Sequence, residues 1–178
     1  MEVISYKNIE PDEELSLSCQ SPPLHTQQAS HSFSPLLTDT PLNILSTDRQ
    51  KMLKFWGFTC TCALCRNTQA TNTSDRQRLK VQELLTELDD SVNHTHEKVG
   101  AVTAEVEVLV GKEGMVAQIG DLYGIIADVY LAMGDLGLAG IYGELAVELL
   151  RHYAGFDSAR TQRALGFMEA LERRAKQP

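Results

Sequence analysis

Apolar residues recur at helical spacing through residues 122–153, and this pattern constrains the fold more than any other feature of the 178-residue chain. Residues three and four positions apart share one face of a helix, so each apolar set marks a buried face. The sequence "MGDLG" at residues 133–137 supplies a turn between the two sets. The pattern predicts an antiparallel helical hairpin with two apolar faces, formed by Leu122, Ile125, Ile126, Val129, Tyr130 and Met133, and by Leu138, Ile141, Tyr142, Leu145, Leu149 and Tyr153.

The spacing of aromatic and small residues in this hairpin resembles that of a tetratricopeptide unit. The matching residues are Tyr123, Ile126, Ala127, Tyr130, Ala139 and Ala146, and the alanines allow the two helices to approach closely. One such unit cannot bury both of its faces, so further helices must pack on it. We interpret the apolar faces as packed core, with a peptide-binding groove as the alternative.

Three further helices are expected around the hairpin. The first follows a linker, "NTQATNTSD" at residues 67–75, with Ser74 and Gln77 as its capping box. The second covers residues 97–110. The third runs from about residue 158 to 176, and its inward residues are Leu165, Met168 and Leu171. Together these helices predict a helical C-terminal domain over residues 75–178.

The N-terminal part of the chain has a different character. Residues 1–19 contain two short β-type stretches around a turn at Pro11 and Asp12, which predicts a hairpin that needs partners in a larger sheet. Residues 20–47 are rich in Ser, Thr, Pro, Gln and His and predict a flexible loop. Residues 48–66 begin with a short helix, capped by Ser46 or Thr47. The expected fold class is therefore α+β, mainly α.

Three of the four cysteines lie within the sequence "WGFTCTCALC", at Cys60, Cys62 and Cys65. Thiolates are favoured ligands of structural zinc, so this C-x-C-x-x-C spacing predicts a zinc loop rather than buried thiols. Zinc takes four ligands, and three are supplied here. The fourth lies either outside the given chain or among Cys19, His25, His31, His94, His96 and His152, of which Cys19 is the best internal candidate.

The charge of the chain limits its partners. The formal net charge of −8 argues against non-specific nucleic-acid binding, which requires clustered Lys and Arg, and favours a cationic partner. No apolar run reaches the length of about 20 residues that a membrane span needs. The N-terminus also lacks the layout of a secretory signal. We therefore expect a soluble intracellular protein, in the nucleus or the cytoplasm, that does not bind membranes.

The order of these pieces resembles the C-terminal end of a SET-domain protein lysine methyltransferase, closest to fungal SET proteins and the related SET-and-MYND branch. The matching pieces are "NIEPDEELSLSC", Arg49-Gln50 with Leu53, "WGFTCTCALC" and the helical tail. The resemblance covers most of the chain apart from the loop. It implies that Cys60, Cys62 and Cys65 are the post-SET zinc ligands. It also implies that Phe58 helps to hold the adenine of S-adenosylmethionine and that Trp56 lies beside the lysine channel.

Two departures from the family pattern bear on activity. Cys19 stands where the family has a tyrosine at the site of methyl transfer, and a thiol is a weaker hydrogen-bond donor, so no catalytic residue is assigned. The cofactor-binding segments and most of the SET sheet are also absent from these residues. The resemblance thus implies a fragment that is inactive alone and whose complete form would act on a lysine-containing protein. We interpret residues 19–39 as an insertion relative to the family.

A non-catalytic protein is the competing interpretation. It would combine the zinc loop with a helical-repeat scaffold that binds a peptide or protein partner. Affinity for S-adenosylmethionine discriminates between the two interpretations.

Overall fold

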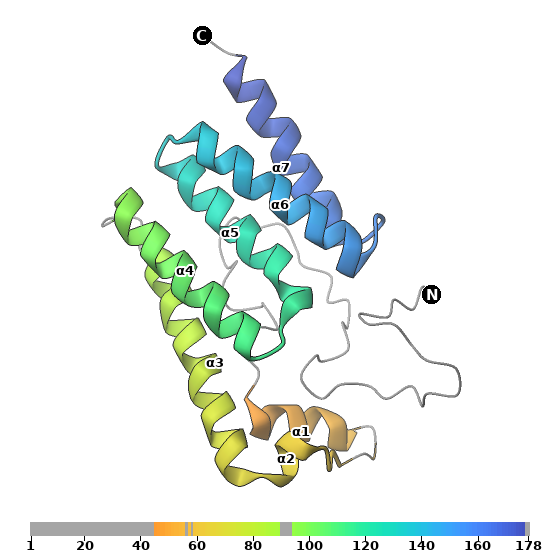
Figure 1. The fold of residues 1–178 in the computed structure, drawn as a ribbon. Coiled ribbons are helices and arrows are strands. Elements are labelled where there is room, and N and C mark those ends of the chain that lie inside the picture. Colours follow the sequence, from red (N-terminus) through yellow and green to blue (C-terminus); the bar gives the residue numbers. More distant parts are fainter. Residues whose placement is uncertain (1–44, 56, 58, 90–93, 177–178) are drawn as a thin grey trace.

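The computed structural model of the chain describes residues 45–55, 57, 59–89 and 94–176, and it contains only helices there (Figure 1). The predicted helical character is confirmed, whereas the described residues contain no strand. The expected hairpin of residues 1–19 and most of the expected loop of residues 20–47, up to residue 44, lie outside the described residues. Ser46 and Thr47, at the end of that expected loop, belong to α1 instead. The helices are α1 (Ser46–Phe55), α2 (Ala63–Arg66), α3 (Thr68–Asp89), α4 (His96–Lys112), the 3₁₀ helix η3 (Val116–Gln118), α5 (Ile119–Ala132), α6 (Leu136–Ala154) and α7 (Ala159–Ala175).

Helices α5 and α6 form the predicted antiparallel hairpin and share the most extensive packing in the described chain. Small side chains allow this close approach, since Ala127, Ala139 and Ala146 are almost completely buried. The turn uses Gly134 at a φ of 82°, which glycine adopts without a steric penalty. Asp135 then caps α6 by accepting a hydrogen bond from the Leu138 N–H at 2.9 Å. The hairpin prediction is confirmed.

Helix α7 packs along α6, as Figure 1 shows. Ser158 caps it, because its hydroxyl accepts a hydrogen bond from the Thr161 N–H. Leu171 is buried, while Leu165 and Met168 are half-buried, so the predicted inward face is confirmed. Gly143 of α6 leaves the space that Met168 occupies.

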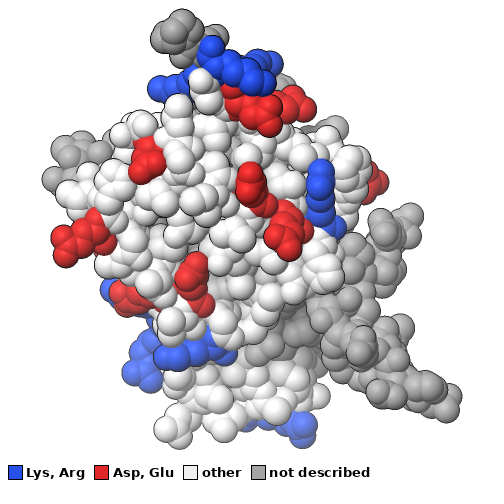
Figure 2. All heavy atoms as spheres, turned by 45° about the horizontal axis from the view of Figure 1, so that its top comes forward, with Lys and Arg blue, Asp and Glu red and all other residues white. Residues whose placement is uncertain are grey.

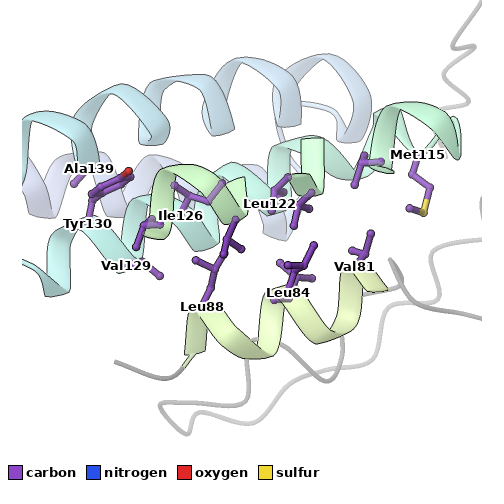
Figure 3. Packing of buried hydrophobic residues seen from close by; sticks show 14 of the residues in the cluster. Val81, Leu84, Leu88, Met115, Leu122, Ile126, Val129, Tyr130 and Ala139 are labelled. Atoms are coloured by element: carbon purple, nitrogen blue, oxygen red, sulfur yellow. The ribbon is translucent and has the colours of Figure 1, made fainter. Parts of the chain in front are cut away.

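Helices α3 and α4 cover the other side of α5. Figure 3 shows Val81, Leu84 and Leu88 of α3 directed toward Leu122 and Ile126 of α5. These side chains belong to one hydrophobic cluster that extends over α3, α4, α5, α6 and α7. The α4 helix matches the expected 97–110 segment and is two residues longer at its C-terminal end.

The predicted linker at residues 67–75 is wrong, because α3 already begins at Thr68. Asn67, not Ser74, occupies the capping position: its side-chain oxygen accepts a hydrogen bond from the Ala70 N–H at 3.1 Å. Ser74 lies inside the helix and is 3% exposed. The polar composition was misleading because tertiary contacts of α3 outweigh the low helix propensity of Asn and Thr.

Candidate metal centre

The sulfur atoms of Cys60, Cys62 and Cys65 all lie within 4.8 Å of one another. All three are reduced thiols; Cys60 and Cys65 are half-buried, and Cys62 is exposed. A tetrahedral zinc ion with Zn–S bonds of about 2.3 Å places its sulfurs about 3.8 Å apart. Small side-chain adjustments therefore suffice to bring the three sulfurs to that spacing. The donor set fits zinc, and the predicted convergence of the trio is confirmed.

A single helical turn sets the relative positions of Cys62 and Cys65. Cys62 is the N-cap of α2, and the Arg66 N–H donates to its carbonyl at 3.0 Å. The Cys65 N–H points at the Cys62 sulfur at 3.5 Å. A backbone N–H directed at sulfur favours the thiolate, which is the form that binds metal. The short C-x-x-C spacing thus folds into a turn that presents two donors on one side.

Gln50 of α1 holds the backbone of Cys60, the remaining member of the trio. Its side-chain amide donates to the Cys60 carbonyl at 3.3 Å, and its side-chain oxygen accepts from the Cys60 N–H at 3.4 Å. The two bonds satisfy both backbone groups of Cys60 at a point where the chain has no regular structure. The loop is therefore fastened to α1 through its first cysteine.

Helix α1 is in turn attached to α3 through Ser46, Arg49 and Asp75, which we call the α1 anchor. The Asp75 carboxylate accepts hydrogen bonds from the Ser46 N–H at 2.8 Å and from the Ser46 hydroxyl at 2.6 Å. Arg49 is 3% exposed and lies 4.0 Å from the same carboxylate. The expected self-cap by Ser46 or Thr47 is wrong, because a carboxylate from another helix satisfies the start of α1 instead.

One turn further along α3, a buried ion pair connects this helix to the end of α4. The Arg78 Nε donates to the Glu113 carboxylate at 3.1 Å, and the Ser74 hydroxyl donates to the same oxygen at 2.5 Å. Arg78 is fully buried and Glu113 is 6% exposed. Burial lowers the pKa of Arg78, and the neighbouring Arg49 lowers it further, against the opposing effect of Glu113. Separate polar contacts thus attach the cysteine loop to α1, α1 to α3, and α3 to the end of α4.

A fourth ligand is not found among the residues that the structure describes, where the cysteine trio has no further His, Cys, Asp or Glu beside it. His96 instead contacts the Asp135 carboxylate at 2.8 Å, and His152 packs edge-on against Tyr153. His94 is also outside the cluster. The other internal candidates, Cys19, His25 and His31, lie outside the described residues, as do Trp56 and Phe58.

The sequence indicated the ligands but not their supports. In the sequence, Gln50 is recognisable only as part of the Arg-Gln motif of the resemblance. No sequence pattern marks Asp75, Arg78 or Glu113 as residues that support the loop. Ser74 and Arg78 extend the buried face of α3 beyond Val81, but their polar side chains give no sign of burial until the partner helix is placed. The support of the cysteine loop is therefore a tertiary property.

Comparisons with known proteins add no relative. No protein-family model, curated protein or solved structure matches the chain. Within the described part of the chain, none of the helices has the length and apolar character required to cross a membrane.

Proposed function

We propose that Cys60, Cys62 and Cys65 hold a structural zinc ion and that the chain is the C-terminal part of a SET-domain protein lysine methyltransferase. The observation that carries the metal assignment is the convergence of three thiols in a loop whose backbone is fixed by Gln50. The family assignment is supported by the order of motifs in the sequence. In that order a post-SET cysteine loop precedes a helical tail, and the described helices are compatible with such a tail.

In this proposal the metal joins segments that have little apolar core of their own. Zinc supplies a four-coordinate cross-link when bound. The chain provides three thiolates, a backbone N–H directed at Cys62, and the two bonds of Gln50 to Cys60. The α1 anchor then connects the ordered loop to the helical domain. Trp56 and Phe58 precede the loop in sequence, at positions where the family that the chain resembles has aromatic residues beside the lysine channel and the adenine of the cofactor.

The reaction of the complete family member is methyl transfer from S-adenosylmethionine to a lysine ε-amine. In that family the Asn-His motif that binds the cofactor, and the cysteine that follows it, lie outside the portion that this chain resembles. We therefore expect the 178 residues alone to bind S-adenosylmethionine weakly or not at all and to transfer no methyl group. A coding sequence that continues upstream into Asn-His followed closely by Cys would supply both the cofactor site and the fourth zinc ligand.

A non-catalytic interaction protein is the second candidate. It is favoured by the continuous core of α3 to α7, which gives the chain a helical scaffold independent of any SET sheet. In this candidate the zinc loop stabilises one end of the scaffold and the helices bind a partner.

Metal affinity and cofactor affinity together test the two candidates. Zinc dissociation constants are measured by competition with a chromophoric chelator for the wild-type chain and for Cys60→Ser, Cys62→Ser and Cys65→Ser. Thr61→Ala, in the same loop, is the matched control because its side chain is exposed and is not a thiol. We expect each serine variant to lose at least about tenfold in affinity and Thr61→Ala to be unchanged.

The outcomes separate the parts of the proposal. Equal zinc affinity in all variants would refute the metal centre. Calorimetry then measures whether the chain binds S-adenosylmethionine, which tests the family assignment. Restoration of binding when the upstream coding segment is added supports the methyltransferase, whereas a segment that adds no affinity favours the interaction protein.

A further inference from the structure

A row of tyrosines crosses α5 and α6, away from the cysteine loop. Tyr123 and Tyr130 lie two turns apart on α5, and Tyr142 of α6 contacts both of them. The ring centroids of Tyr142 and Tyr130 are 5.6 Å apart with nearly parallel planes, and those of Tyr142 and Tyr123 are 5.7 Å apart at 52°. His96 of α4 continues the row at 5.8 Å from Tyr130. Four aromatic rings from three helices thus form one continuous array.

Exposure varies along the row. Tyr130 is 3% exposed and belongs to the core, whereas Tyr123 and Tyr142 are half-buried and 59% of the His96 side chain is exposed. Tyr123 and Tyr142 are therefore partly accessible from solvent. A half-buried tyrosine offers an apolar body with a polar tip, a combination that is enriched where proteins bind one another.

Glu107 of α4 lies beside Tyr123 and Tyr142. Burial raises the pKa of Tyr123 to about 12, and a hydrogen bond to Glu107 is the next cause. The pKa of Tyr142 is also raised, first by burial and then by the charge of Glu107. Among the residues that the structure describes, no Lys or Arg forms an ion pair with Glu107. A carboxylate therefore lies beside two partly exposed aromatic rings without a cation of its own in this region.

The surrounding helices are acidic. Residues 96–154 contain nine acidic and three basic residues, so this third of the chain carries most of the formal net charge of −8. Figure 2 shows the face obtained when the top of Figure 1 is turned forward, where acidic side chains are scattered over a largely uncharged surface, with basic side chains mainly at its top and lower edges and one among the acidic ones on the right. A cationic ligand is therefore favoured over an anionic one in this region.

We propose that Tyr123, Tyr142 and Glu107 form a docking site for an arginine-bearing segment of a partner protein. A guanidinium stacks on an aromatic face and pairs with a carboxylate through its planar array of N–H groups, so one arginine side chain satisfies both features. The site does not depend on the metal centre.

Fluorescence anisotropy on the full 178-residue chain tests the proposal. The probe is a fluorescein-labelled dodecapeptide of alternating arginine and alanine, and the comparison peptides carry lysine or glutamate in place of arginine. We expect the arginine peptide to bind at least about threefold more tightly than the lysine peptide and the glutamate peptide not to bind. No binding of the arginine peptide at low salt, or equal binding of the arginine and lysine peptides, would overturn the proposal.

Variants locate the site on the surface. Glu107→Gln and Tyr142→Leu are each expected to weaken the arginine peptide about fivefold, whereas Tyr142→Phe retains the ring and stays within about twofold. Glu172→Gln removes an exposed carboxylate on α7 and is the matched control for the loss of one negative charge. Because Tyr142→Leu also alters packing, its helicity and melting temperature are checked by circular dichroism, and Glu107→Gln tests the site without that change. Equal weakening by Glu107→Gln and Glu172→Gln would show attraction to net charge only and contradict the site.

Discussion

The carboxylate of Asp75 on α3 accepts hydrogen bonds from both the backbone N–H and the hydroxyl of Ser46, the first residue of α1. The two residues are 29 positions apart, with the whole cysteine loop between them. This contact closes the segment that carries the candidate metal ligands into a loop with fixed ends. The orientation of the loop therefore depends on a residue that cannot itself reach the metal.

Asp75→Asn is expected to destabilise the N-terminal helices by about 1–2 kcal/mol, because it removes the charge that offsets the buried Arg49 and weakens the cap of α1. Urea unfolding followed by circular dichroism measures the effect. Asp48→Asn is the control, since the Asp48 carboxylate is exposed and pairs only with the exposed Lys51 in the described structure. If the two variants are equally stable, the anchor has no energetic role.

Gln50→Ala is expected to weaken zinc binding about tenfold, because the Cys60 backbone loses both of its side-chain partners and the loop must be ordered by the metal alone. Chelator competition measures the affinity. Gln82→Ala, an exposed glutamine on α3, should leave it unchanged. Unchanged affinity in Gln50→Ala would mean that the loop is ordered without α1.

Arg78→Met is expected to cost about 3–5 kcal/mol of unfolding free energy, because it leaves the Glu113 carboxylate buried without its cation. The double variant Arg78→Met with Glu113→Leu should recover most of this loss, since both charges are then absent. Urea denaturation of the two variants and the wild type gives the comparison. A double variant less stable than Arg78→Met would contradict the account of a desolvated ion pair.

Gly143→Ala and Gly140→Ala, three residues apart on α6, are expected to have opposite effects. A Cβ at Gly143 would collide with the Met168 sulfur and lie 3.0 Å from the Phe167 ring, so the variant should lose about 1–3 kcal/mol. At Gly140 the nearest atom is 3.6 Å away, so alanine should add about 0.5–1 kcal/mol through helix propensity. Thermal unfolding reports both. Similar melting temperatures for the two variants would refute the close contact of α6 and α7.

The stability contributed by Asp135 is expected to disappear in acid. The hydrogen bond from the Leu138 N–H, followed by the one with His96, holds the pKa of Asp135 below its ordinary value of 3.8. A carboxylate with a lowered folded-state pKa stabilises the protein fully above its unfolded pKa and ceases to do so as the pH falls through the folded value. The melting-temperature difference between the wild type and Asp135→Asn should therefore shrink as the pH falls below 3.8. The exposed Asp157→Asn serves as control, and a difference that grows in acid would have the wrong sign.

The helices of residues 96–175 could be predicted from the sequence because each repeats its apolar residues over several turns. The cysteine trio could also be predicted, since its donors are close in the chain. The start of α3 could not, because residues 67–75 have the composition of a linker and become helical through contacts made elsewhere.

The polar contacts made by Gln50, Asp75 and Glu113 could not be predicted from the sequence either. Its partners are 10, 29 and 35 residues apart, and no periodicity connects residues at such separations. Only the packing of α1 and α4 against α3 brings them together. Residues that fix a site from another helix therefore need the structure to be recognised.

The zinc content of the purified chain tests the central claim most directly. After expression with zinc and dialysis without chelator, mass spectrometry of the metal and amino-acid analysis of the protein give the stoichiometry. We predict about one zinc ion per chain, and almost none in the variant with serine at residues 60, 62 and 65. A wild-type chain that is folded and contains no zinc, or a triple variant that retains its zinc, would contradict the account.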